Sequence, residues 1–403
     1  MMTTIGRTFF RLHAVVAMAA MWAAVLLAPA AAAAEPEARQ WDQATASALL
    51  AYIEGIGSHG LDPGDYAPAQ LRQAMASGDP ATVERQATRS FGLVAEDLAI
   101  GHVKPGHRGR YYIAPNTLDP TRVARMIEIA ISAGQVSWVL DTLAPQNPEY
   151  AALRAALETA AGAAERRQVL ANLERWRWLP HNPGVRYVMV NIPDFRLRLM
   201  ENGREISAHR VIVGKRSTPT PQFSAQITAV ILNPSWHVPQ SIIAESVGRL
   251  VRTRPGEARN RGYTWSSGGS GRLQVTQQPG PTNALGQLKL EMANPLTVYI
   301  HDTPNKDLFE RDERTFSHGC IRTQAPFELG EALLAGTAWT REAMDRTVET
   351  RQTTRAPLAE PVPVYVVYMT AVPQADGTVR YLGDPYNLDA AIAARLAENA
   401  GGS

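Results

Sequence analysis

The spacing of the apolar residues changes near residue 179 and divides this 403-residue chain into two regions. Before that point, apolar positions recur at helical spacing, and glycine and proline interrupt them, as in residues 44–53 and 83–98. After it, short runs alternate with period two, as in residues 195–199. We therefore predict an α+β protein, with a mostly helical scaffold domain over residues 35–178 and a β-rich domain over residues 179–403.

The second region carries the signals of a small antiparallel sheet. Asn202-Gly203 suits a tight hairpin turn and lies between two of the alternating runs. We expect a sandwich or barrel built from strands over residues 185–190, 195–199, 206–213, 226–232, 296–300 and 362–368. In the first region we also expect a helix over residues 119–133 and another that begins at Asn147-Pro148, before residues 151–171, which are rich in alanine and charge. In the second region we expect helices over residues 326–334, 340–348 and 389–399.

Residues 236–290 are less regular than their surroundings. They contain a helical stretch over residues 241–251 and a Gly/Ser-rich piece over residues 265–271. A long insertion between strands often covers a functional site, so we interpret this segment as an insertion with its own structure.

The N-terminus has the pattern of a secretory signal. Arg7 and Arg11 precede an apolar run over residues 14–28, and small residues over 30–34 offer a cleavage site. An uncleaved membrane anchor is the alternative, although the run is short of the about 20 residues that a spanning helix needs. We predict a signal peptide over residues 1–34 and export to the periplasm.

The charge balance argues against a nucleic-acid partner. The chain has 40 Lys and Arg residues against 38 Asp and Glu residues. Removal of residues 1–34, which contain two arginines and no acid, leaves 38 of each. A neutral chain lacks the basic excess of a nucleic-acid-binding protein and has no electrostatic reason to bind anionic lipid, so membrane contact would require the uncleaved N-terminal segment.

Cys320 is the only cysteine of the chain. It cannot form an internal disulfide, and an exported free thiol is prone to oxidation unless it has a function. Its surroundings, Ser-His-Gly-Cys-Ile-Arg at residues 317–322, lack the apolar period expected of a buried structural cysteine. A thiol needs a base to become a thiolate, and His301 lies 19 residues upstream at the end of a predicted strand. We predict Cys320 as nucleophile and His301 as base.

The other residues of the motif have two interpretations each. His318 is the alternative base, but its position two residues before the cysteine gives poor geometry for a direct contact, so it either orders the loop or contacts substrate. Ser317 and Gly319 are expected to shape the loop, and the N–H groups of Gly319 and Cys320 could form an oxyanion hole. Arg322 either holds a substrate carboxylate or forms an internal ion pair.

A zinc site is the strongest competing chemistry. His301, His318 and Cys320 could supply three ligands, but no Cys-x-x-Cys or His-Glu-x-x-His pattern accompanies them. We therefore predict no metal.

The motif at residues 317–322, preceded by His-Asp-Thr-Pro at residues 301–304, resembles the signature of YkuD-type L,D-transpeptidases. Residues 278–286, 233–239 and 172–180 resemble further segments of the large proteobacterial branch, the YcbB-like group. The resemblance covers residues 170–390 strongly and residues 40–170 weakly. No Phe-Gln…Gly-Leu pattern of that group's peptidoglycan-binding module is present.

The resemblance implies a cysteine acyltransferase that cross-links peptidoglycan stem peptides, with loss of a terminal D-alanine from a tetrapeptide donor. It also implies acylation by carbapenems, no metal or organic cofactor, and a capping subdomain at residues 236–290. Tyr299, Asn283 and Trp236 match family motifs, and we expect them in the substrate cleft, mainly as scaffolding.

Three alternatives share the same residues. Water as acceptor would give a carboxypeptidase or amidase, and a protein lysine would give lipoprotein attachment. A shift of donor or acceptor within the stem would give another linkage, such as one from the first stem residue. A wall-binding protein without activity is the non-enzymatic alternative, and the complete His301–Cys320 pair argues against it.

Overall fold

The computed structural model describes residues 40–267 and 272–398, which belong to one compact unit. The predicted signal peptide at residues 1–34 and the Gly/Ser-rich residues 268–271 lie outside the described part. Within the described part, no helix combines the length and apolar content needed to cross a bilayer.

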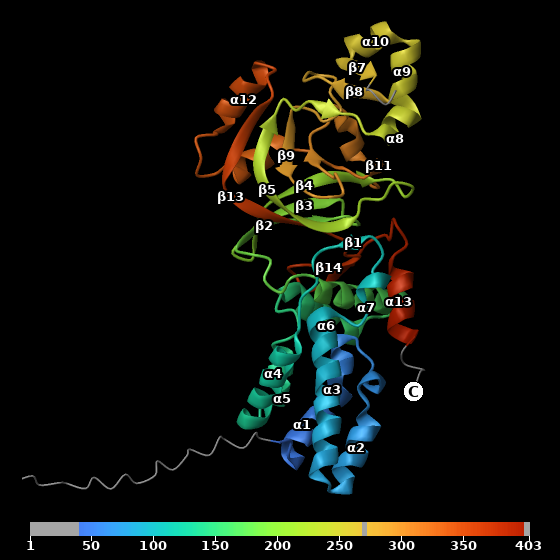
Figure 1. The fold of residues 1–403 in the computed structure, drawn as a ribbon, viewed down its shortest axis with the longest axis vertical. Helices are drawn as coiled ribbons and strands as arrows, with labels where there is room; N and C mark the ends of the chain where they lie inside the picture. The colour runs from blue at the N-terminus through green and yellow to red at the C-terminus, as the bar shows by residue number, and fades with distance from the viewer. Residues whose placement is uncertain (1–39, 268–271, 399–403) are drawn as a thin grey trace, which may run out of the picture. The chain divides into compact units, whose positions relative to one another are not determined.

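The region before residue 179 is helical, as predicted, and it is drawn from blue to green in Figure 1. Its α-helices are α1 (Gln43–Gly55), α2 (Pro68–Ser77), α3 (Pro80–Ile100), α4 (Pro120–Ala133), α5 (Val136–Asp141), α6 (Pro148–Thr159) and α7 (Ala163–Trp178). Short 3₁₀ turns connect some of them: η1 (Ile56–His59), η2 (Pro63–Tyr66) and η3 (Pro105–His107).

Local sequence explains where these helices begin. Asp79, Asp119 and Asn147 each cap a helix with a side-chain oxygen that accepts a backbone N–H, and each is followed by proline at the first helical position. A helix begins directly after Asn147, as expected, but residues 151–171 are divided between two helices, α6 and α7. The division arises because the chain leaves the helix after Thr159 and Gly162 adopts an extended conformation before α7.

The second region, with one short strand of the first, forms a large sheet whose strands follow the order β1-β5-β13-β2-β3-β4-β12-β10-β9. A further pairing of β9 with β5 closes this path on itself, and β11 pairs with β4. The strands are β1 (Tyr111–Tyr112), β2 (Arg186–Asn191), β3 (Arg196–Glu201), β4 (Arg204–Gly214), β5 (Gln222–Leu232), β9 (Leu288–Met292), β10 (Ile300–His301), β11 (Thr315–Ser317), β12 (Ile321–Thr323) and β13 (Thr354–Val367). The β-rich prediction is therefore confirmed.

Two faces of this sheet bury different cores. Alternate residues of the strands, such as Val188, Leu199 and Ile321, pack together in one apolar cluster on the inner face. On the outer face of β2 and β13, Tyr187, Met189, Tyr365 and Val367 join the core of the helical region instead. The helical region thus packs on the side of the sheet formed by β2 and β13.

Two strands differ from their predicted lengths. The strand predicted over 296–300 is reduced to β10, because Thr297 has a positive φ of 53° and the Asn294 side chain bonds the chain into a turn. The closing strand predicted over 362–368 is longer, since β13 begins at Thr354 and continues past an irregularity in its pairing with β5 between Pro357 and Val362.

The insertion is a separate small layer, drawn in yellow beside the main sheet in Figure 1. It contains a three-stranded sheet of β6 (Trp236–His237), β8 (Leu273–Gln277) and β7 (Tyr263–Ser267). Helices α8 (Gln240–Ile242), α9 (Gly248–Thr253) and α10 (Pro255–Asn260) and the π-helical turn η4 (Ile243–Val247) pack on it around a small apolar cluster.

Elements after β12 complete the fold. They are α11 (Pro326–Leu333), α12 (Arg341–Glu349), the hairpin of β14 (Ala371–Pro373) and β15 (Val379–Tyr381), and α13 (Asp389–Glu398). The 3₁₀ turn η5 (Lys306–Glu310) lies in the connection between β10 and β12. The bounds of α11, α12 and α13 agree with the predicted helices to within one residue.

Candidate active site

Cys320 and His301 come from two strands that lie side by side. Strands β10 and β12 are parallel neighbours, with Ile300 opposite Ile321 and His301 opposite Arg322. The Ile321 N–H donates to the Tyr299 carbonyl at 2.8 Å, which extends the register so that Tyr299 lies beside Cys320. His301 and Cys320 are thus offset by two residues along adjacent strands, a separation of about 7 Å along the strand direction.

Both side chains project from the same face of the sheet. Ile300 and Ile321 are fully buried in the inner core, and side chains alternate along a strand. Tyr299 and His301 on one strand, and Cys320 and Arg322 on the other, therefore point to the outer face. The next strand adds Lys289, which lies opposite His301 and is flanked by the core residues Leu288 and Leu290.

The His301 imidazole is oriented by the backbone. It is only 4% exposed, and its Nδ1 lies within hydrogen-bonding distance of the Asp302 carbonyl. Because a carbonyl only accepts, Nδ1 carries the hydrogen and Nε2 keeps its lone pair, as a base requires. Burial, with the nearby charges of Arg322 and Lys289, lowers the pKa of His301 to about 3, although hydrogen bonds to the Asp302 and Leu285 backbone act in the opposite direction.

Cys320 is half-buried, and its thiol is free. Burial raises its pKa above the ordinary value, while the Tyr299 backbone N–H and the charges of Arg322 and Lys289 act in the opposite direction. With the thiol pKa raised and the imidazole pKa lowered, the resting pair is a neutral thiol and a neutral imidazole.

The loop before Cys320 is held by a set of polar contacts. The Ser317 hydroxyl donates to the Cys320 carbonyl and accepts from the Gly319 N–H at 3.1 Å. The Gly319 carbonyl accepts from the Thr220 hydroxyl at 2.8 Å. Gly319 has a φ of 113°, a conformation that residues with a Cβ rarely adopt, so glycine is required for the shape of this loop.

These contacts change the predicted oxyanion hole. We expected the N–H groups of Gly319 and Cys320 to act together, but the Gly319 N–H already donates to Ser317. The Cys320 N–H is therefore the better candidate donor of the two.

His318 is exposed and contacts the insertion rather than the thiol. Its Nε2 lies 2.7 Å from the Glu245 carboxylate in η4. This contact joins the motif loop to the residue 236–290 segment. Among the residues that the structure describes, no three histidine, cysteine or acidic side chains gather closely enough to hold a metal ion.

Asn283, which we expected in the cleft mainly as scaffolding, lies in the loop before β9. It is fully buried, its amide group donates to the carbonyls of Pro234, Gln277 and Gln278, and its oxygen accepts from the Leu285 N–H. The amide is thus fully used in holding the loop before β9.

The same loop packs against Asp302, the residue that follows His301. Gly286 has a φ of 63°, and a Cβ at this position would lie 2.2 Å from the Asp302 carboxylate. Asp302 in turn accepts from the Gln287 N–H at 2.8 Å. Close approach of this loop to Asp302 fixes the backbone that orients His301.

The remaining predicted residues lie in two different places. Tyr299 and Arg322 share the outer face with Cys320, whereas Trp236 belongs to β6 and packs on the small core of the insertion. Lys289 was missed by the sequence reasoning, although its ammonium lies 4.6 Å from the centre of the Tyr299 ring. The signal was the alternation of Leu288, Lys289 and Leu290, but only the pairing of β9 with β10 shows that Lys289 faces the thiol.

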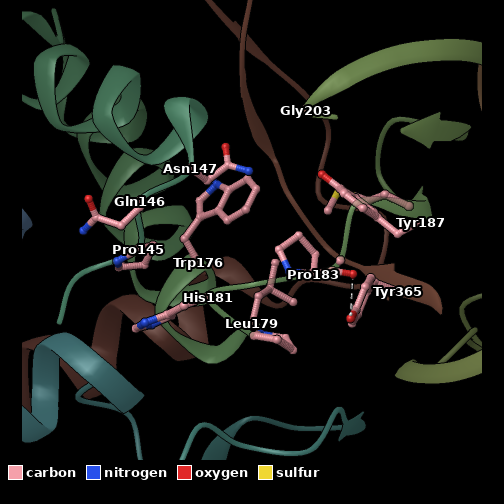
Figure 2. A pocket seen from close by; sticks show the side chains of 13 residues that line it. Pro145, Gln146, Asn147, Trp176, Leu179, His181, Pro183, Tyr187, Gly203 and Tyr365 are labelled. Atoms are coloured by element: carbon pink, nitrogen blue, oxygen red, sulfur yellow. Dashed lines mark hydrogen bonds between the residues drawn. The ribbon is translucent and has the colours of Figure 1, made fainter. Parts of the chain in front are cut away.

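A separate pocket lies where the helical region meets β2 and β13, and none of the candidate active-site residues lines it. It has a volume of about 230 Å³, and Figure 2 shows Trp176 on one side of it and Tyr187 and Tyr365 on the other. The Tyr365 hydroxyl donates to the Pro183 carbonyl at 3.2 Å across its floor. The Trp176 indole N–H is buried without a hydrogen-bond partner.

Comparison with known proteins identifies both regions of the chain. Residues 185–349 match the family model of the YkuD L,D-transpeptidase catalytic domain, and residues 38–157 match a family described as a scaffold domain. A curated Haemophilus influenzae protein named "Putative L,D-transpeptidase" is 30% identical over 238 residues, which cover 55% of this chain and 48% of that protein. The chain thus spans about half the length of the curated relative that it matches.

Two solved structures show more distant likeness. An L,D-transpeptidase from Mycobacterium smegmatis is 12% identical, with 45% of this chain and 58% of that chain covered and a TM-score of 0.24. The L,D-transpeptidase LdtMt1, solved in complex with imipenem, is 14% identical, with 45% and 59% covered and a TM-score of 0.24.

The chain therefore has a mostly helical region that matches a scaffold domain over residues 38–157, followed by a β-rich region. Residues 185–349 of the β-rich region match the L,D-transpeptidase catalytic domain of the YkuD family, which agrees with the resemblance found in the sequence.

Proposed function

We propose that this protein is a periplasmic L,D-transpeptidase that joins peptidoglycan stem peptides through a thioester on Cys320. The proposal rests on one observation. A domain that matches the L,D-transpeptidase family holds Cys320 and a neutral, oriented His301 on the same face of adjacent parallel strands.

The first half-reaction transfers the donor acyl group to sulfur. His301 Nε2 takes the thiol proton as the sulfur attacks the carbonyl carbon of the donor amide. The tetrahedral intermediate then collapses, the C–N bond breaks, and the imidazolium returns the proton to the leaving amine. The products are a thioester on Cys320 and a free D-amino acid, and the imidazole is neutral again.

The second half-reaction runs the same steps in reverse with a different amine. His301 takes a proton from the acceptor amine as its nitrogen attacks the thioester carbon. The C–S bond breaks, and the proton passes from the imidazolium to the thiolate. A new amide bond forms and the thiol is regenerated, so no external reactant is consumed. The Cys320 N–H would stabilise the oxyanion in both halves.

Because the resting pair is neutral, proton transfer must create a thiolate and an imidazolium, and separating these charges in a buried environment costs free energy. Arg322 and Lys289 lower this cost, since their positive charges favour the thiolate over the thiol. The same charges disfavour protonation of His301, which keeps the base available.

We also propose that carbapenems inactivate the protein by acylating Cys320. The thiol sulfur would attack the carbonyl carbon of the strained lactam, and the carbonyl C–N bond of the ring would break. The thiol proton would pass through His301 to the ring nitrogen, which stays linked to the acyl group through the rest of the carbapenem skeleton. LdtMt1, one of the structural relatives, was solved in complex with imipenem.

The test is incubation of the purified protein with defined stem tetrapeptides, followed by mass spectrometry of the products. A cross-linked dimer with loss of one terminal residue supports the proposal, and a Cys320→Ser variant should give none while its circular dichroism is unchanged. Hydrolysed donor without dimer would identify a carboxypeptidase instead. Undiminished cross-linking by Cys320→Ser would overturn the assignment of the nucleophile.

A further inference from the structure

The hydroxyl of Thr220 orients the peptide group that carries the candidate oxyanion donor. Thr220 is buried, and its hydroxyl donates to the Gly319 carbonyl at 2.8 Å. That carbonyl belongs to the same peptide group as the Cys320 N–H, and in a planar trans peptide the two bonds point in opposite directions. A contact that fixes the Gly319 oxygen therefore also fixes the direction of the Cys320 N–H. The contact polarises the peptide group as well, which makes the N–H a stronger donor.

Thr220 belongs to the turn between β4 and β5, and this turn holds the motif loop, residues 317–320, at a second carbonyl. The Lys215 N–H and the Thr218 hydroxyl donate to the Ser317 carbonyl at 2.9 and 3.2 Å. The position of the motif loop thus depends on the shape of this turn.

One side chain from a distant part of the chain closes the turn. The Tyr386 hydroxyl donates to the Gly214 carbonyl at 2.7 Å and accepts from the Thr220 N–H at 3.2 Å. Gly214 is the last residue of β4, and its own N–H donates to the Thr220 hydroxyl at 2.8 Å. A single phenol oxygen therefore connects the two ends of the turn that holds the motif loop.

The position of Tyr386 is fixed by the end of the main sheet. Its N–H donates to the Tyr368 hydroxyl at 2.8 Å, and the two rings lie 5.6 Å apart. Tyr368 is fully buried directly after β13, and its hydroxyl donates to the Asp384 carboxylate. Tyr386 lies outside residues 185–349, which match the catalytic-domain model, so its contribution comes from the C-terminal part of the chain.

We propose that Tyr386 is a positioning residue for the acyl transfer, and that it acts on the Cys320 N–H through Thr220. This inference rests on the proposed function. Without the phenol oxygen, the Gly214 carbonyl and the Thr220 N–H lose their shared partner, and the turn no longer holds the motif loop in one position. The oxyanion forms only on the way through the transition state, so a misdirected N–H lowers kcat and leaves KM nearly unchanged.

Tyr386→Phe is the direct test, because it removes the phenol oxygen and keeps the ring beside Tyr368. With a synthetic stem tetrapeptide as substrate, we expect kcat to fall about 10-fold, less than the 100- to 1,000-fold that loss of a whole oxyanion donor costs. KM should change by less than about 2-fold. Tyr365→Phe is the matched control, since it also removes a phenol that donates to a backbone carbonyl, and it should keep the wild-type kcat.

A double-mutant cycle tests whether Tyr386 acts through Thr220. Thr220→Val replaces the hydroxyl with a methyl group and should lower kcat at least as much as Tyr386→Phe, whereas Thr220→Ser keeps the hydroxyl and should restore most of it. In the Thr220→Val background, Tyr386→Phe should lower kcat by less than about 2-fold, because the path it acts through is already broken. Urea unfolding of each variant shows how far stability changes.

The outcomes separate this inference from the proposed function. A wild-type kcat in Tyr386→Phe, or a raised KM with kcat unchanged, would overturn the positioning role and leave the transpeptidase proposal intact. An equal fall in kcat for Tyr365→Phe, or independent effects in the double variant, would also contradict it. Failure of the folded wild-type protein to cross-link the tetrapeptide would overturn the proposed function and this inference with it.

Discussion

At the scale of single residues, the protonation of the Cys320–His301 pair decides the chemistry. A thiol with a raised pKa beside an imidazole with a pKa of about 3 is a neutral pair over the whole ordinary pH range. This differs from sites in which a thiolate and an imidazolium are present before substrate binds.

We predict that the rate of acylation by imipenem stays nearly constant as the pH falls from 7 to 5. His301 keeps its lone pair in this window, because its pKa lies near 3. A histidine with the ordinary pKa of about 6.5 would be protonated and would lose about 30-fold in rate by pH 5. Stopped-flow or mass-detected acylation kinetics would measure the profile.

His318→Gln is the control for this profile, because it removes the other histidine of the motif. The variant should show the same flat dependence. A fall in the wild-type rate that follows an apparent pKa near 6.5 would show that His301 is not held neutral as described.

Gly319 is a second residue whose role is local. We predict that Gly319→Ala destabilises the protein by about 1–3 kcal/mol through its positive φ, since the nearest atom to a new Cβ is 3.8 Å away and no clash arises. Acylation should slow as well, because the residue precedes the nucleophile. Urea unfolding and acylation rates would measure the two effects.

Gly336→Ala is the matched control for Gly319→Ala. Gly336 also has a positive φ, of 83°, with open space around it, but it lies outside the candidate site. It should reduce stability by a similar amount without slowing acylation. An acylation rate reduced equally by both variants would show that Gly319 acts only through global stability.

At the scale of elements, a buried ion pair within helix α7 connects this helix to other segments of the helical region. Glu174 and Arg177 are both fully buried, and a guanidinium nitrogen of Arg177 lies 2.6 Å from a carboxylate oxygen of Glu174. The Glu174 carboxylate also accepts hydrogen bonds from the Val103 N–H and the Trp178 indole N–H. The Arg177 guanidinium further donates to the His59 carbonyl. Residues 172–180, which resemble a family segment, therefore contribute to the core of the helical region.

We predict that Glu174→Gln lowers the free energy of unfolding by about 3–5 kcal/mol, because it leaves the Arg177 charge buried and unpaired. Asp345→Asn breaks the exposed pair with Arg341 and should cost less than about 1 kcal/mol. Equilibrium urea unfolding measures both. Equal costs for the two variants would contradict the role assigned to the buried pair.

At the scale of the whole molecule, several buried histidines link stability to pH. Burial lowers the pKa of His59 to about 3, as it does for His301, so the unfolded chain binds more protons than the folded protein between pH 3 and 6.5. The free energy of unfolding that the neutral His59 and His301 imidazoles contribute is at its maximum above pH 6.5, and it decreases as the pH falls from 6.5 to 3. His102 acts in the opposite direction, because a hydrogen bond to Asp97 raises its pKa.

We predict that the urea midpoint of unfolding falls between pH 7 and pH 4.5. His59→Gln should reduce this dependence, because the glutamine has no proton to gain on unfolding. Its stability should be compared with the wild type at pH 7.5 to separate the loss of the contact with Tyr150 from the pH effect. A midpoint that rises on acidification would contradict this linkage.

Much of the molecule could be predicted from local patterns. Helix caps such as Asp79 and Asp119, the period-two runs and the turn at Asn202-Gly203 are short-range signals, and the structure follows them. The break between α6 and α7 was missed because an alanine-rich segment has helical propensity on both sides of Gly162.

What the sequence alone determined is the class of each region and the chemistry of its reactive groups: one thiol, a histidine at a strand end, and a glycine where the loop needs one. The tertiary structure alone decided which groups share the site. Lys289 lies on the same face as Cys320 because pairing between strands distant in the chain sets the register, and the register determines which side chains share a face.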